Sequence, residues 1–299
     1  MNTKNIVIIG LGKMGSNLAT NLHEQEWSIW GYDPFQKDAL PGVQMMSSFT
    51  EIADVQPRAI ILAVPALAVR EILESLLPHV SHGTVVIDMG NSHYTDTVEN
   101  AAYCESLHIA FLDCGVSGGP AGARSGATCM VGGAKDVYDS VEDIFSDIAR
   151  AAGAYAWVGK SGAGHYLKMI HNQIEYGMIQ AIAEGAYLLA EGPYEISLPD
   201  AFRILSKGTI IESRLVSLGS EILSSTPDFS RIAPRVDASG EAAWALELAH
   251  QIGISLPVTE AALDARRSVD PTSAFIRKFI ALLRNAFGGH HIYHDDESK

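Results

Sequence analysis

The residues best suited to chemistry lie between Lys168 and Tyr176, in the sequence KMIHNQIEY. On a helix, which turns about 100° per residue, four further polar side chains fall within about 80° of Lys168: His171, Asn172, Glu175 and Tyr176. A base and an acid about two helical turns apart can act on opposite ends of a short substrate. The alternative interpretation is a solvated helix face, because lysine, asparagine and glutamate are common on protein surfaces.

A long helix must position these side chains. Apolar residues recur at helical spacing at Leu167, Ile170, Ile174 and Met178, and no proline interrupts the segment. Small residues flank the stripe and suit close packing around a central helix: Gly162, Ala163, Gly164, Ala181, Ala183, Gly185 and Ala186. We therefore expect a central helix over 165–191.

Composition limits the classes of function. The chain of 299 residues has room for two domains, and its 47% hydrophobic and 19% charged residues are typical of a globular protein. Its net charge of −14 argues against a nucleic-acid or anionic membrane partner, so an anionic ligand needs a local basic cluster. The longest apolar run, 59–69, contains Pro65 and is too short to span a bilayer.

Cysteine usage indicates a reducing compartment. Cys104, Cys114 and Cys129 form no CxxC pair and leave an odd number, so we expect reduced, buried thiols. The chain enters a predicted strand without a signal peptide, which favours the cytoplasm. No metal site is expected.

The N-terminal segment has the order of a dinucleotide-binding unit. A buried strand at 5–9 precedes GLGKMG at 10–15, and a helix to about Glu26 precedes a strand at 28–32 that ends at Asp33. The helix N-terminus would direct backbone N–H groups and a partial positive charge at the phosphates of a dinucleotide.

The glycines of GLGKMG have separate roles in such a unit. Gly10 permits the tight turn, Gly12 lets the backbone approach a pyrophosphate, and Gly15 lets the helix pack closely on the sheet. The predicted cofactor contacts are Gly10, Leu11, Gly12, Lys13, Met14, Gly15, Asp33, Val64 and Asn91.

Asp33 predicts the choice of cofactor. A carboxylate there accepts hydrogen bonds from a ribose hydroxyl and repels a 2′-phosphate. No arginine stands beside it, and the nearest base is Lys37. We therefore expect NAD in preference to NADP. The alternative is that Asp33 only caps the turn before Pro34.

Alternating strands and helices predict a mainly parallel sheet covered on both faces. The strands are expected at 58–64, 84–88, 109–113, 128–131 and near 155–158, and the helices at 67–77, 95–107 and 135–150. Two loops would leave the carboxyl ends of strands, where such sheets bind ligands: GNSHYTDT at 90–97 and CGVSGGPAGARSG at 114–126. The second loop could hold a carboxylate with its backbone N–H groups and the Ser117 hydroxyl, or could be a structural turn.

From residue 162 the pattern is helical. Helices are expected at 165–191, about 198–206, 211–224, 239–253, 257–268 and 272–286. The predicted fold is therefore an α/β, Rossmann-like NAD-binding domain at 1–161, followed by an all-α substrate and dimerisation domain at 162–299.

Over nearly its whole length the chain resembles the 6-phosphogluconate dehydrogenases, within the β-hydroxyacid dehydrogenase superfamily. The motifs that carry the resemblance are GLGKMG with Asp33, GNSHYTDT, VSGGPAGARSG, KMIHNQIEY and RNAFGGH at 284–290. KMIHNQIEY is the most specific, because the wider superfamily keeps the lysine and asparagine but not the Glu-Tyr pair. The chain is most similar to the short, NAD-preferring branch of the family.

The resemblance implies oxidative decarboxylation of a 6-phosphogluconate-type aldonate to a ribulose 5-phosphate-type ketose and CO2, with reduction of NAD. Lys168 resembles the general base and Glu175 the general acid, with Asn172 as a third catalytic residue. The implied substrate contacts are Asn91, Ser117, Gly118 and Gly119, then Lys168, His171, Asn172 and Glu175, and at the terminal phosphate Tyr176, Lys207, Thr209 and Arg266. Arg284 and His290 would come from a partner subunit, which implies a homodimer or a dimer of dimers.

Some positions depart from the family pattern. Gln173 stands where the motif often has glycine, Glu212 where short relatives commonly have arginine, and Lys207 where they often have histidine. These departures leave the terminal anion open, so 6-deoxy-6-sulfogluconate is an alternative substrate. Arg267 is an alternative to Arg266, because either of these adjacent residues could face inward. The competing functions are a β-hydroxyacid dehydrogenase that does not decarboxylate and a non-catalytic NAD-binding regulator.

Overall fold

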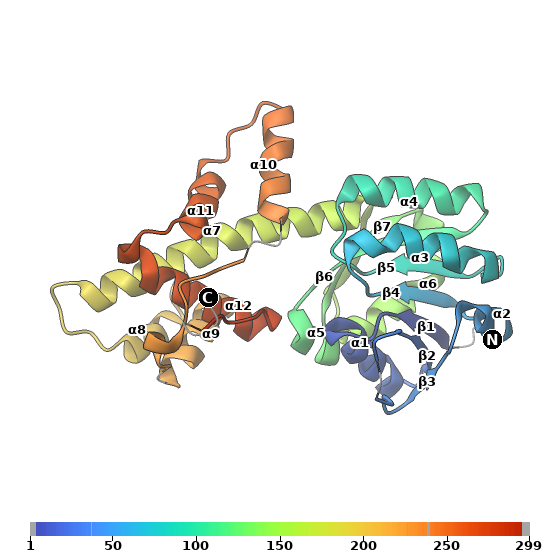
Figure 1. The fold of residues 1–299 in the computed structure, drawn as a ribbon, viewed down its shortest axis with the longest axis horizontal. Helices are drawn as coiled ribbons and strands as arrows, with labels where there is room; N and C mark the ends of the chain where they lie inside the picture. The colour runs from blue at the N-terminus through green and yellow to red at the C-terminus, as the bar shows by residue number, and fades with distance from the viewer. Residues whose placement is uncertain (1–3, 37, 226, 238–239, 295–299) are drawn as a thin grey trace. The chain divides into compact units, whose positions relative to one another are not determined.

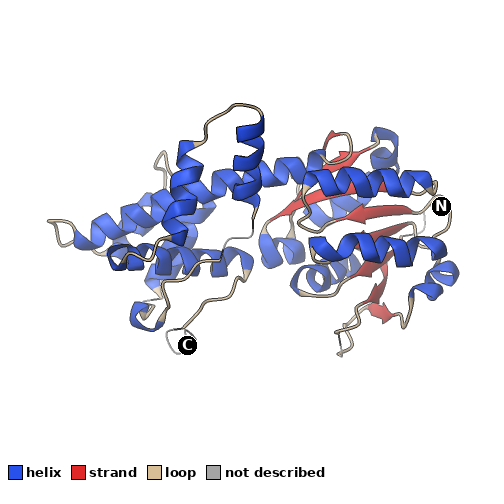
Figure 2. Ribbon diagram, turned by 45° about the horizontal axis from the view of Figure 1, so that its top comes forward, coloured by secondary structure: helices blue, strands red, loops and turns tan. Residues whose placement is uncertain are grey.

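The computed structural model describes residues 4–36, 38–225, 227–237 and 240–294, and it divides into two compact units, Met1–Lys168 and Met169–Lys299 (Figure 1). The first unit contains the whole sheet and the second is helical (Figure 2). The expected fold class, an α/β dinucleotide-binding region followed by a helical region, is confirmed.

An eight-stranded sheet forms the centre of the first unit, in the order β3-β2-β1-β4-β5-β6-β7-β8. Its strands are β1 (Asn5–Ile9), β2 (Ser28–Tyr32), β3 (Val43–Met45), β4 (Ala59–Leu62), β5 (Val85–Asp88), β6 (Ala110–Ser117), β7 (Thr128–Gly133) and β8 (Tyr155–Gly159). Neighbouring strands pair in parallel except β6 and β7, which are antiparallel. The expected mainly parallel sheet is confirmed.

Helices cover both faces of this sheet because its central strands are apolar on both sides. The helices are α1 (Lys13–Glu24), α2 (Ile52–Val55), α3 (Val69–Leu76), α4 (Tyr94–Ser106), α5 (Gly119–Ser125) and α6 (Lys135–Ala149), with short 3-10 turns at Phe49–Glu51, Ala66–Ala68 and Leu77–His79. Along β1, Ile6 and Ile8 join the core that contains α1 and α6, whereas Val7 and Ile9 join the core that contains α3.

The segment 114–126 differs from the expected open loop. Strand β6 continues to Ser117, and α5 occupies Gly119–Ser125. The physical reason is a long-range contact: the side-chain amide of Asn21, which is fully buried in α1, donates to the backbone oxygens of Ala123 and Ile148, each at 3.0 Å. This contact stabilises a helix in a segment whose glycines locally favour a loop.

The second unit is built from α7 (Ala163–Glu191), which begins in the first unit, and from α8 (Leu198–Leu205), α9 (Arg214–Ser224), α10 (Glu241–Gln251), α11 (Pro257–Arg267) and α12 (Ala274–Gly288). Its largest core packs Ile179 of α7 with Phe202 and Phe279, whose ring centres are 5.6 Å apart. Within the described ranges, no helix combines the length and the apolarity that crossing a membrane requires.

The polar stripe of α7, which runs from Lys168 to Tyr176, lies on the buried side of the helix. Met169, Tyr176, Ile179, Ala183 and Ala186 form its buried side. At about 100° per residue, this side coincides with the stripe that carries Lys168 and Asn172. Of the four apolar residues that predict the helix, Ile170 is half-buried and the other three are exposed, with exposed fractions of 39% for Leu167, 53% for Ile174 and 41% for Met178. The inverted pattern disfavours a solvated face for the polar stripe.

Candidate active site

The glycine loop after β1 has the geometry that a dinucleotide requires. Gly10 has a φ of +88°, and a Cβ on Gly15 would lie 1.9 Å from the backbone oxygen of Gly10, so α1 passes too close for a side chain there. A Cβ on Gly12 would meet no atom within 4 Å, which leaves open space at the N-cap of α1. These residues therefore fit a pyrophosphate at the start of α1.

The carboxylate of Asp33 holds this loop in place. One oxygen accepts a hydrogen bond from the backbone N–H of Leu11 at 2.7 Å, and the other accepts from the N–H of Phe35 at 2.8 Å. The turn-capping role considered from the sequence is therefore present. Val64, after β4, also borders the loop, because a Cβ on Gly10 would lie 2.7 Å from its Cγ1.

Asn91 lies in a loop whose two flanking residues are hydrogen-bonded to one buried carboxylate. Asp88, at the end of β5, is fully buried and accepts from the backbone N–H of Gly90 at 2.9 Å and from the hydroxyl of Ser92 at 2.8 Å. Asn91 stands between these two contacts and is exposed. The loop is thus fixed while its middle residue remains accessible.

The carboxylate-binding residues proposed from the sequence lie at the junction of β6 and α5. Ser117 is the last residue of β6 and pairs with Thr128. Gly118 has a φ of +124° and Gly119 a φ of +60°, conformations that favour glycine. The backbone oxygen of Gly118 accepts from the N–H of Gly122 at 2.9 Å, the first helical hydrogen bond of α5, so the chain passes from strand to helix within two residues.

Lys168 lies against strand β6. A Cβ on Gly115 would be 2.5 Å from the Cβ of Lys168 and 2.7 Å from the backbone oxygen of Gly164, so glycine at 115 permits this close approach. Lys168 itself is half-buried.

A buried carboxylate that the motifs did not identify caps α7. Asp113 accepts from the backbone N–H groups of Gly162 at 2.7 Å and His165 at 2.9 Å, and its side chain is fully buried. The ring of His165, also buried, is 2.8 Å from the hydroxyl of Thr97. In the sequence, the only sign of this cap is an aspartate at the end of the apolar strand predicted at 109–113.

In the second unit, a polar chain begins on α7 and ends on α10. His171 Nδ1 is 2.9 Å from Asn172 Oδ1, and Asn172 Nδ2 donates to Glu241 Oε1 at 2.9 Å. Glu241 is only 2% exposed and was not predicted as a site residue. Gln173, the departure from the family motif, donates to the hydroxyl of Thr259 at 2.6 Å and so joins α7 to α11.

Arg266 is a buried cation above an aromatic ring. Its guanidinium carbon lies 3.4 Å from the centre of the Tyr176 ring, and the two residues are 5% and 2% exposed. Among the described residues, none forms a hydrogen bond with its three guanidinium nitrogens. Burial lowers the pKa of this guanidinium to about 10. The neighbouring Arg267 is exposed, so Arg266 is the inward residue.

A buried charge without a hydrogen-bonding partner is costly unless a ligand supplies one. An anion with several oxygens would satisfy the planar guanidinium. Arg266 also borders a pocket of about 430 Å³ that Arg235, Asp237 and Arg267 help to line. Arg284, which is buried in α12, lies 3.5 Å from His290 Nδ1 in the same unit.

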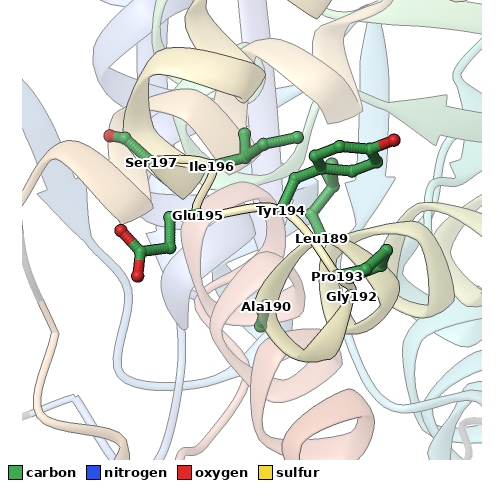
Figure 3. Close-up of a pocket in the computed structure, with 8 residues that line it drawn as sticks. All are labelled: Leu189, Ala190, Gly192, Pro193, Tyr194, Glu195, Ile196 and Ser197. Carbon is green, nitrogen blue, oxygen red and sulfur yellow. The ribbon is translucent and has the colours of Figure 1, made fainter.

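Other predicted residues have local contacts. Lys207 is exposed after α8, and the hydroxyl of Thr209 donates to the backbone oxygen of Leu205 at 2.7 Å. Glu212 accepts from the backbone N–H of Gly208 at 2.6 Å, which accounts for a carboxylate at this position. A pocket of about 370 Å³ between α7 and α8, lined by residues 189–190 and 192–197, contains none of the predicted site residues (Figure 3).

Comparison with protein families gives two adjacent matches. The profile described as the NAD binding domain of 6-phosphogluconate dehydrogenase matches residues 5–159, and the profile of the 6-phosphogluconate dehydrogenase C-terminal domain matches residues 164–296.

Curated relatives agree, and two of them match over nearly their whole length. A putative 6-phosphogluconate dehydrogenase, YqeC, of Bacillus subtilis is 35% identical over 95% of this chain and 98% of its own length. The NAD(+)-dependent, decarboxylating 6-phosphogluconate dehydrogenase of Haloferax volcanii is 33% identical over 97% of this chain and 99% of its own length. The Synechococcus elongatus enzyme is 34% identical over 87% of this chain, but the match covers only 60% of that longer protein.

Solved structures place the fold in the same group. The 6-phosphogluconate dehydrogenase of Plasmodium falciparum superposes with a TM-score of 0.79 and 28% identity, over 95% of this chain and 70% of that one. A 3-hydroxyisobutyrate dehydrogenase of Mycobacterium tuberculosis, at 22% identity, superposes with a TM-score of 0.72 over 95% of this chain and 99% of that one, and shares the fold. With both family profiles matched in order along the chain, the protein belongs to the 6-phosphogluconate dehydrogenase family.

Proposed function

We propose that the protein oxidises and decarboxylates a 6-phosphogluconate-type aldonate with NAD, giving a ribulose 5-phosphate-type ketose and CO2. The observation that carries the proposal is the buried guanidinium of Arg266, which lies over Tyr176 and has no hydrogen-bonding partner among the described residues. A terminal oxyanion on the sugar acid supplies the missing acceptors.

NAD is the proposed cofactor. When bound, its nicotinamide accepts a hydride from the substrate. The open space at Gly12 suits the pyrophosphate, with the segment Gly10–Gly15 around it, and Asp33 disfavours a 2′-phosphate. Val64 and Asn91 complete the proposed contacts. The Haloferax relative is named as NAD(+)-dependent, whereas the Plasmodium enzyme was solved with NADP+.

Lys168 is the proposed general base. It takes the proton of the hydroxyl on the carbon that loses hydride, so that a 3-keto acid forms. The carboxylate then leaves as CO2, because the neighbouring ketone accepts the electron pair. Glu175, about two helical turns further along α7, donates a proton to the carbon that lost CO2. The ketose is the product.

The remaining contacts orient the substrate. Asn172 and His171 bind the sugar hydroxyls, and the hydrogen bond between Asn172 and Glu241 fixes the amide of Asn172. Ser117, Gly118 and Gly119 bind the carboxylate end. Tyr176 and Arg266 bind the terminal anion, and Lys207 and Thr209 are further proposed contacts to the same group.

A homodimer is the proposed assembly. The exposed apolar residues of α7, Leu167, Ile174 and Met178, offer a face that a second copy would cover. Arg284 and His290 are proposed to contribute to the site of the partner subunit. The three buried, free cysteines suit the reducing cytoplasm as the proposed location.

The test is NADH formation with 6-phosphogluconate, followed by absorbance, with released CO2 trapped in parallel. Equal amounts of NADH and CO2 are expected. NADH without CO2 would identify a dehydrogenase that does not decarboxylate, and NAD binding without NADH formation on any aldonate would identify a non-catalytic protein. Either result rejects the proposal.

A further inference from the structure

The buried carboxylate of Glu241 lies beside the proposed anion site. Glu241 is the first residue of α10, is 2% exposed, and accepts a hydrogen bond from Asn172 on α7. Asn172 is four residues before Tyr176, so their side chains lie one helical turn apart on the same side of α7. Arg266 covers the ring of Tyr176.

The packing of three helices brings Glu241 and Arg266 to this side of α7. Tyr176, Ala242, Ala262 and Leu263 form one buried cluster that joins α7, α10 and α11. Ala242 follows Glu241 directly, and Ala262 and Leu263 lie one helical turn before Arg266. The two opposite charges are therefore held on neighbouring helices around the same aromatic ring.

The carboxylate of Glu241 is close enough to act electrostatically on Arg266. Burial lowers the pKa of Arg266, and Tyr176 and the carboxylates of Glu175 and Glu241 oppose that shift. Glu241 therefore places a buried negative charge near the guanidinium that is proposed to bind the anion.

A buried carboxylate beside the anion site favours a ligand that carries less negative charge. A phosphate monoester, whose second pKa is about 6, carries nearly two negative charges at pH 8. A sulfonate has the same tetrahedral arrangement of three oxygens and carries one. In a site removed from water, an extra negative charge beside the Glu241 carboxylate is costly.

We propose that Glu241 sets the charge of the terminal group that the site accepts, so that a singly charged tetrahedral oxyanion such as a sulfonate is preferred over a doubly charged phosphate. This inference rests on the proposed function, because it concerns the C6 substituent of the same aldonate. It assigns to Glu241 a role in specificity and not in the chemical steps.

The experiment measures kcat/KM for NADH formation at pH 8 with 6-deoxy-6-sulfogluconate and with 6-phosphogluconate. The wild-type enzyme is expected to favour the sulfonate. Glu241→Gln keeps an oxygen that can accept from Asn172 but removes the charge, so the ratio should move toward the phosphate by on the order of 10–100-fold. Glu241→Asp keeps the charge and should keep the wild-type preference.

Glu260→Gln is the matched control. Glu260 is exposed on α11 and pairs with His250, so the same loss of charge there should leave the ratio unchanged within about twofold. A wild-type preference for the phosphate, or an unchanged ratio in Glu241→Gln, overturns the inference while NADH formation upholds the proposed function. If neither compound yields NADH, the proposed function fails and the inference fails with it.

Discussion

The guanidinium of Arg266 and the ring of Tyr176 are stacked 3.4 Å apart in a buried part of the second unit. The ring supplies an attractive face for the cation but no hydrogen-bond acceptor in its plane. The guanidinium nitrogens thus have no hydrogen-bond acceptor among the described residues, and a ligand with several oxygens would supply one. This relationship favours the proposed binding role of Arg266 over a purely structural one.

Replacing Arg266 should weaken substrate binding without weakening the fold. Arg266→Met removes the proposed anion contact, so KM for the aldonate should rise by about 30-fold or more. It also removes a buried charge that has no hydrogen-bonding partner among the described residues, so the urea midpoint of unfolding should stay the same or increase. Arg267→Met, at the exposed neighbouring position, should change neither quantity. A large loss of stability with an unchanged KM would identify Arg266 as structural.

Asp113 should stabilise the start of α7. Both carboxylate oxygens accept backbone N–H groups, at Gly162 and His165, whereas asparagine would place an NH2 donor against one of them. Asp113→Asn should therefore lower the free energy of unfolding by about 1–3 kcal/mol, measured by urea titration. Asp139→Asn, at an exposed ion pair with Lys135, should cost less than about 0.5 kcal/mol. Equal losses in the two variants would contradict the capping role.

Strand positions in the first unit could be predicted closely from local pattern. The strands Asn5–Ile9 and Ser28–Tyr32 match their predicted bounds, because short apolar runs end at a glycine and at an aspartate. Helix α5 could not be predicted, because the buried amide of Asn21, about a hundred residues earlier, holds it. Strand β3 was also not predicted, because it is only three residues long and has no clear alternation of apolar and polar residues.

The same limit applies to the candidate site: positions set by helix geometry could be predicted, whereas contacts between residues far apart in the sequence could not. The spacing in KMIHNQIEY placed Lys168, Asn172 and Tyr176 on one side of a helix, because helical geometry is local. Glu241 was missed because its role depends on a contact with Asn172, 69 residues away. The sequence alone could not distinguish Arg266 from Arg267, because they are adjacent and have the same side chain. The packing of α11 distinguishes them, since it buries Arg266 and leaves Arg267 exposed.

The glycines of the dinucleotide loop should respond differently to alanine. At Gly15 a methyl group would collide with the backbone of Gly10, so Gly15→Ala should lower the thermal midpoint of the first unit by several degrees. At Gly12 the methyl group enters open space, so Gly12→Ala should fold normally but bind NAD about tenfold or more weakly. Calorimetry for stability and for NAD binding checks the pair. Normal NAD affinity in a folded Gly12→Ala protein would argue against a pyrophosphate at this position.

Asp33 should control discrimination between the two nicotinamide dinucleotides. The wild-type enzyme should show a higher kcat/KM with NAD than with NADP, because the carboxylate repels a 2′-phosphate. Asp33→Asn removes the charge and should narrow the NAD-to-NADP ratio by about tenfold. Its NH2 group would also face the backbone N–H of Leu11 or Phe35, so the ratio, and not the affinity for either cofactor alone, is the readout. Asp38→Asn, at an exposed position in the same loop, should leave the ratio unchanged. A wild-type preference for NADP would refute the assignment of cofactor.

Variants of the two proposed proton-transfer residues should be slowed at different steps of the reaction. Lys168→Met should reduce NADH formation by about 100-fold or more, even in a single turnover, because the hydroxyl proton has no acceptor. Glu175→Gln should retain a rapid burst of NADH and slow the steady state, because protonation of the carbon that lost CO2 follows hydride transfer. Stopped-flow absorbance distinguishes the two profiles, and NAD binding should be unchanged in both variants. Glu184→Gln, an exposed position on the same helix, should behave like the wild-type enzyme. Loss of the burst in Glu175→Gln would mean that Glu175 acts before or during hydride transfer, which the proposed order of steps does not allow.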